Sequence, residues 1–199
     1  MFQEDKMRKL IVKVVLCLVT MFIGLGAAVG QTTTLRLDHE SSTAFNLWVV
    51  HETNSGLVVE TICSSGGWLE TDIGWNFRVA SWLNLLLMDG FVVDGGRVQQ
   101  MVPIAIALIN AGHISGEMWH MFFWDFTAEY PSIYVRYLLT YRGFGTFFEG
   151  TFLDEDLGMK VVGGVASGNI TKDLGFQVMF GSQLTEYDLS YRLSLLYSF

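Results

Sequence analysis

The sequence predicts an all-β chain that folds as a transmembrane, antiparallel, up-and-down β-barrel, and three observations support this. Apolar and polar residues alternate with period two over many short segments, which is the period of a β-strand. Turn-forming clusters of Gly, Ser, Asn and Asp separate most of these segments. Charged residues make up only 16% of a chain that is 51% hydrophobic, against roughly 25% in average soluble proteins.

The last segment, YDLSYRLSLLYSF at 187–199, shows the alternation most clearly. Every second residue from Leu189 to Phe199 is large and apolar, and five of the six positions between Asp188 and Ser198 are polar. The same pattern recurs in the segments 45–52, 69–79, 132–142 and 174–182. Each segment therefore has one apolar face and one polar face.

Two kinds of fold bury such faces. A soluble sandwich or barrel turns the apolar face inward, whereas a transmembrane barrel turns it toward lipid and keeps the polar face in the lumen. A soluble β-protein of this length needs more Lys and Glu outside to stay dissolved and to protect its edges. We therefore favour the transmembrane barrel, with a soluble exported β-sandwich or barrel as the alternative.

Turn signals divide the chain into eleven segments. They cover about 33–40, 44–53, 57–63, 68–88, 97–110, 117–128, 132–141, 144–153, 157–166, 172–181 and 187–199. The segment 68–88 is too long for one membrane strand of roughly 9–11 residues, and a bend near Ala80-Ser81 would make it two. Single-chain bacterial barrels have even strand numbers, so 12 strands are favoured, with 10 or 8 as alternatives.

The stretch MVPIAIALI at 101–109 fits the strand pattern least well. Pro103 has no N–H to donate to a neighbouring strand. A short helix is the alternative expectation there.

The first 30 residues have the layout of a secretory signal peptide. Arg8, Lys9 and Lys13 precede an apolar run, and the small residues Ala27, Ala28 and Gly30 follow it. The barrel then spans 31–199, with eight basic and 18 acidic side chains and a net charge of −10. So acidic a chain is not expected to bind nucleic acid.

The C-terminal strand resembles the assembly signal of bacterial outer-membrane β-barrel proteins. The matching residues are Tyr191, Tyr197 and the terminal Phe199 on an alternating strand. The resemblance implies a small porin-like protein of a Gram-negative outer membrane. Its implied partners are outer-membrane lipids and the barrel assembly machinery.

If the apolar faces meet lipid, charged side chains fall on the inner face. The residues singled out are Glu70, Asp72, Arg78, Asp125, Arg136, Glu149, Lys160 and Arg192. Buried charges must pair or face water because desolvating each ion costs several kcal/mol. A barrel wider than about eight strands leaves space inside. The sequence thus predicts a narrow, mildly acidic, passive channel for small solutes or ions, with a closed structural barrel as the alternative.

An enzymatic reading rests on His113 and Ser115, which loosely resemble the His-x-Ser of outer-membrane lipid A deacylases. The Asn that follows the Ser in that family is Gly116 here, and the downstream Asn-Pro-Gly is missing. We therefore expect a polar turn at 113–116 and no catalytic residues, with a lipid-modifying enzyme kept as an alternative. No motif predicts a cofactor or a metal site.

Overall fold

The computed structural model describes residues 32–40, 45–126, 131–153, 156–184 and 189–198. The predicted signal peptide, 1–30, and Phe199 lie outside the described residues. None of the described residues belongs to a helix long and apolar enough to cross a membrane.

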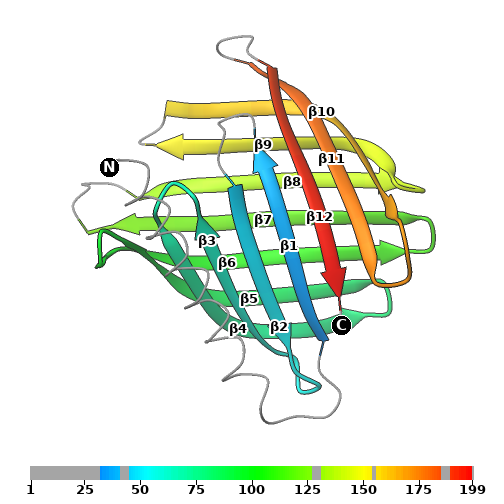
Figure 1. Ribbon diagram of the computed structural model, residues 1–199, viewed down its shortest axis with the longest axis horizontal. Coiled ribbons are helices and arrows are strands. Elements are labelled where there is room, and N and C mark those ends of the chain that lie inside the picture. The colour runs from blue at the N-terminus through cyan, green and yellow to red at the C-terminus, as the bar shows by residue number, and fades with distance from the viewer. Residues whose placement is uncertain (1–31, 41–44, 127–130, 154–155, 185–188, 199) are drawn as a thin grey trace, which may run out of the picture.

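Twelve strands form one closed antiparallel barrel (Figure 1). They are β1 (Thr32–Glu40), β2 (Phe45–Glu52), β3 (Leu57–Ser64), β4 (Leu69–Ala80), β5 (Leu83–Asp94), β6 (Arg97–Ala111), β7 (Ile114–Asp125), β8 (Ser132–Tyr141), β9 (Phe144–Leu153), β10 (Asp156–Asn169), β11 (Leu174–Gln183) and β12 (Leu189–Ser198). In Figure 1 the wall containing β1, β2 and β12 crosses steeply in front of the wall containing β6 to β8. The predicted fold class and the favoured strand number are confirmed.

The barrel closes by pairing its last strand with its first. Leu35 lies opposite Tyr197 and Asp38 opposite Ser194 in the ladder between β1 and β12. Every other strand pairs with its neighbours along the chain. Closure leaves no open sheet edge, which is what hydrocarbon requires of a β-structure.

The strand pairing decides the structure of two segments for which the sequence left alternatives open. The long segment 68–88 is divided by a turn at 81–82 into β4 and β5, as the bend predicted near Ala80-Ser81 requires, and β5 continues to Asp94. The stretch around Pro103 is strand rather than helix. Pro103 pairs with Asp89 of β5, but the ladder to β7 passes from Met101 directly to Ile104, because proline cannot donate the hydrogen bond.

Two hairpins have two consecutive residues in the left-handed region of the backbone. Gly95 and Gly96 join β5 to β6 with φ of 58° and 80°, and Arg142 and Gly143 join β8 to β9 with φ of 53° and 84°. Positive φ at both residues is typical of the two-residue turns that match the twist of paired strands. These turns keep the barrel wall tight at its rims.

The two faces of the wall differ as a membrane barrel requires. Large apolar side chains stay exposed on the outer face, among them Trp75, Phe77, Phe91, Leu139, Phe180 and Leu195. On the inner face, apolar side chains from β3 to β7 pack into one buried cluster, and those from β8 to β11 into a second. Side chains therefore fill the middle of the barrel more completely than the strand number alone predicted.

We name the two ends of the barrel by their residues. The near end holds Thr32, Ser198 and the turns at 53–56, 81–82, 112–113, 142–143 and 170–173. The far end holds the connections at 65–68 and 95–96.

Candidate functional site: the barrel interior

Strand register fixes which residues point into the barrel. Glu60 of β3 pairs with Asp72 of β4, which pairs with Gly90 of β5, and paired residues share one side of a sheet. Glu60 and Asp72 are both buried, so their side is the interior. Among the described side chains, the acids on this side are Asp38, Glu52, Glu60, Glu70, Asp72, Asp94, Glu117, Asp125 and Glu149, and the bases are Arg36, Arg78, Arg97, Arg136 and Arg192.

Three of these acids gather on β3 and β4. Glu60, Glu70 and Asp72 are all buried. Gly90 makes room for them, because a Cβ there would coincide with the Asp72 carboxylate. Neither Asp72 oxygen has a hydrogen-bond partner in the described part of the chain. No group of His, Cys, Asp and Glu among the described residues, this acidic cluster included, could hold a metal ion.

A second group of charges joins β8, β9 and β12. Glu149 accepts two hydrogen bonds from Arg192, of 2.9 and 3.4 Å, and lies 3.5 Å from Nε of Arg136. Arg136 is 2% exposed and also lies 3.8 Å from Glu117. A buried guanidinium needs such partners because desolvation would otherwise exceed the Coulombic gain. The positive charges of the two arginines are therefore balanced by the negative charges of the two glutamates.

A third group lies at the seam where the barrel closes. Arg36 of β1 donates from Nε to Asp38 at 2.7 Å and from Nη2 to Ser194 of β12 at 3.3 Å. Its guanidinium carbon lies 5.4 Å from the ring centre of Trp48 on β2. The seam is therefore tied by polar contacts on its inner side.

One aromatic contact crosses the interior. The rings of Trp48 on β2 and Trp119 on β7 meet edge to face, with centres 6.2 Å apart. Four strands separate β2 from β7 along the wall, so this is contact across the lumen. Arg136 covers Trp119 at 5.7 Å, as Arg36 covers Trp48. We call Arg36, Trp48, Trp119 and Arg136 the crossbridge.

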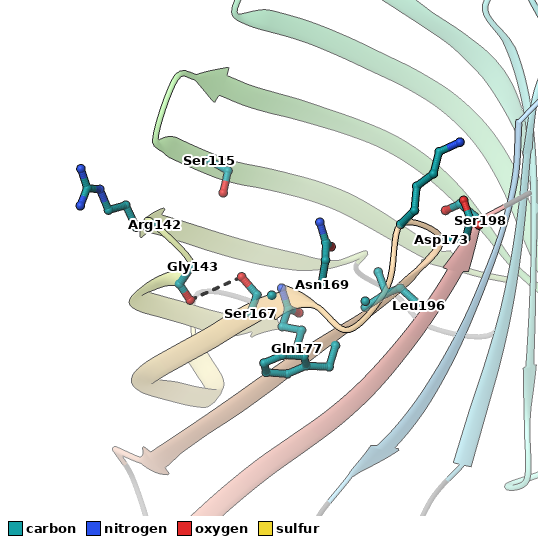
Figure 2. Close-up of a pocket in the computed structure, with 13 residues that line it drawn as sticks. Ser115, Arg142, Gly143, Ser167, Asn169, Asp173, Gln177, Leu196 and Ser198 are labelled. Atoms are coloured by element: carbon teal, nitrogen blue, oxygen red, sulfur yellow. Dashed lines mark hydrogen bonds between the residues drawn. The ribbon is translucent and has the colours of Figure 1, made fainter.

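A polar vestibule opens at the near end. It consists of two cavities of about 510 and 540 Å³ that share Ser115, Ser167 and Gln177. Figure 2 shows Ser167, Asn169 and Gln177 close together, while the Arg142 guanidinium points away from them. That guanidinium lies over the outward Tyr141 ring. Hydroxyl and amide groups line the vestibule, together with the charged side chains of Arg78 and Glu117.

The far end has a cavity of its own, of about 580 Å³. Its lining is acidic and aromatic, with Glu70, Asp94 and Asp125 beside Trp68 and Phe123. Gln100 donates to Asp125 at 3.4 Å. The interior thus has a hydroxyl- and amide-rich near mouth, an acidic far mouth and a filled middle.

The predicted inner charges are distributed over these parts. Glu70 and Asp72 belong to the acidic cluster, while Arg136, Glu149 and Arg192 form one network. Arg78 lines the near cavity and Asp125 the far one.

Lys160 differs from its expected position. It pairs with Gly150, whereas the next residue, Val161, pairs with the inward Glu149. Lys160 therefore stands on the outer side of the wall. The physical reason is an irregularity in the ladder between Leu157 and Lys160, since one extra residue reverses which side every later side chain faces.

The crossbridge tryptophans were not singled out from the sequence. In this part of the chain Phe122, Trp124 and Phe126 are exposed on the outer side. Trp119 points inward because it shares its face with Glu117 and Asp125. Trp119 is an even number of positions from both Glu117 and Asp125, so it shares their face of the strand. This spacing was the signal in the sequence that could have placed Trp119 inside.

The predicted assembly residues lie on the last strand. Tyr191 and Tyr197 are 37% and 46% exposed on the outer face of β12, and Phe199 lies outside the described residues. Tyr191 also contacts the ring of His39 on β1 edge to face.

Comparison with known proteins gives the fold a context. No protein-family model and no curated protein matches the chain. Among solved structures it is similar to a KdgM porin, with 11% identity and a TM-score of 0.62 over 84% of this chain and 99% of that one, and to the same porin "in complex with disordered oligogalacturonate" with the same values. It is also similar to a NanC porin, with 10% identity and a TM-score of 0.57 over 83% and 98%. The chain therefore has the fold of these small porins, as the resemblance of its last strand implied.

Proposed function

We propose that this chain is a passive, cation-preferring channel of a bacterial outer membrane. The observation that carries the proposal is the inverted polarity of the wall, with exposed aromatic and aliphatic side chains outside and charged side chains inside. A soluble barrel would have the opposite arrangement. The porin fold of the chain and the signal peptide predicted at 1–30 support export to that membrane.

The charge of the interior supports the preference for cations. The described inner side chains include nine acids and five arginines. Rings and clusters of carboxylates raise the local concentration of cations in a pore. Most of the excess of acids over arginines lies in the acidic cluster and in the lining of the far cavity.

The ligand of one structural neighbour fits this interior poorly. The KdgM porin structure contains oligogalacturonate, a chain of sugars that each carry a carboxylate. Acids outnumber arginines on the described inner face, which disfavours such a polyanion. We propose small cations as the permeant species of this chain.

The enzymatic alternative is less well supported. The ring of His113 lies edge-on to the outward Tyr141, at 6.1 Å between centres, whereas the Ser115 hydroxyl is 2.6 Å from Thr140 on the inner side. A nucleophile and its base must be within hydrogen-bond reach, and these two side chains have partners on opposite sides of the wall.

A second candidate function is a closed structural barrel, which the filled middle favours. Potassium efflux from liposomes containing the refolded chain separates the two. A leak that exceeds that of empty liposomes and of the heat-unfolded protein supports the channel. A folded barrel without a leak supports the closed barrel and contradicts the channel.

A further inference from the structure

We infer that the crossbridge is the constriction of this channel and that it limits passage to small cations. The inference rests on the proposed channel function. It starts from the contact between Trp48 and Trp119, whose rings meet across the lumen at 6.2 Å. A contact between strands on opposite walls narrows the lumen at that level.

Each indole ring is held in place by a neighbouring charged side chain. Arg36 covers Trp48 and is itself bound to Asp38 at 2.7 Å. On the opposite wall the Trp119 ring N–H donates to Glu117 at 2.9 Å. Cation–π contact strengthens where water is excluded, so the crossbridge is a fixed element and not a pair of free side chains.

Arg136 has more partners than Arg36, which contacts Asp38 and Ser194. Arg136 lies over Trp119, 3.5 Å from Glu149, and donates to Gln177 of β11 at 3.2 Å. Trp119 is therefore fixed through two hydrogen-bonded carboxylates, Glu117 and Glu149. Movement of Trp48 is the easier way to part the rings.

The crossbridge lies between the two cavities. Trp119 and Trp48 pack in one apolar cluster with Leu108 on one side and with Val92 and Phe123 on the other. Leu108 lines the near cavity, and Val92 and Phe123 line the far cavity. The cluster therefore separates this near cavity from the far cavity.

The chemistry around the crossbridge selects what can pass. Ile62 of β3 pairs with Trp48 on one side and with Glu70 on the other. Glu60 and Asp72 pair with each other two positions further along β3 and β4. An apolar constriction excludes water and ions until it widens, and nearby carboxylates favour cations over anions when it does. Small inorganic or organic cations are the class that fits.

Single-channel recording of the refolded full chain in planar bilayers tests the inference. The variants are Trp48→Ala, Trp119→Ala and the double substitution. Trp75→Ala is the matched control, because Trp75 is 50% exposed on the outer face. We expect a severalfold rise in unitary conductance for the inner substitutions, largest for the double variant, and none for the control. Heat-modifiable gel mobility verifies folding, and Trp48→Phe and Trp119→Phe replace any alanine variant that does not fold.

The outcomes separate the inference from the proposed function. A conducting wild type whose inner variants have the same conductance overturns the constriction and leaves the channel intact. A silent wild type with conducting inner variants supports the constriction in its closed state. Folded protein that stays silent in every variant contradicts both.

Discussion

Arg192 of β12 and Glu149 of β9 are joined by two hydrogen bonds of 2.9 and 3.4 Å, although β10 and β11 separate their strands in the wall. The same carboxylate lies 3.5 Å from Arg136 of β8. Paired hydrogen bonds between a guanidinium and a carboxylate are among the stronger polar contacts in proteins. Glu149 therefore links three strands through one buried group.

Glu149→Gln should destabilise the barrel strongly, because it leaves two arginines in the interior without their shared counter-charge. Removing one partner of a buried ion pair costs about 3 kcal/mol or more. Urea unfolding in detergent, followed by gel mobility, measures the loss. Asp173→Asn, at an exposed turn, should leave the unfolding free energy unchanged. Equal stability of wild type and Glu149→Gln would show that the network does not support the fold.

Neutralising the acidic cluster should weaken the preference for cations. Glu60→Gln together with Asp72→Asn removes two buried inner carboxylates while keeping their size. The ratio of potassium to chloride permeability should fall toward one, since the field of these groups is lost. Asp89→Asn removes one charge from the outer side of the same wall and should change the ratio little. A ratio unaffected by the double substitution would assign selectivity elsewhere.

Gly90→Ala should destabilise the wall because its new Cβ meets the Asp72 carboxylate and lies 2.8 Å from the Thr71 carbonyl oxygen. Overpacking of this kind costs about 1–3 kcal/mol. Gly164→Ala is the control, since its nearest contact would be 3.8 Å away. Unfolding of both variants in urea makes the comparison. A loss of the same size at both positions would mean that Gly90 has no special role beside Asp72.

Leu195→Arg should destabilise the barrel if the outer face meets lipid. Leu195 is 50% exposed and lies between Leu37 and Phe176 on that face. An arginine facing lipid near the bilayer midplane costs about 2–4 kcal/mol, falling toward zero at the interfaces. Leu184→Arg, at the rim after β11, should therefore cost much less. Refolding into lipid vesicles at a series of urea concentrations gives both values, and the opposite order would contradict the membrane orientation.

Period-two patterns predicted much of the fold. Val178 and Phe180 face outward and Met179 inward, as alternation in β11 requires. The bend near Ala80-Ser81 and the closing strand were also predicted, because turn chemistry and strand period are local properties of the sequence.

The interior could be predicted only in part. Alternation gives the side of the wall on which a residue stands, so Glu70, Asp72 and Arg136 could be selected. It cannot give the contact between Trp48 and Trp119, because that depends on how the closed wall brings β2 and β7 together. Nor can it foresee the irregularity that turns Lys160 outward, since a shift of one residue follows from pairing and not from composition.

The reversal potential of the refolded chain in a planar bilayer, under a gradient of potassium chloride, tests the central claim most directly. The account predicts measurable current whose reversal potential shows potassium to be more permeant than chloride, because carboxylates outnumber arginines on the inner face. A reversal potential that shows chloride to be more permeant would contradict the role given to Glu60, Glu70 and Asp72. Folded protein that carries no current would contradict the channel itself.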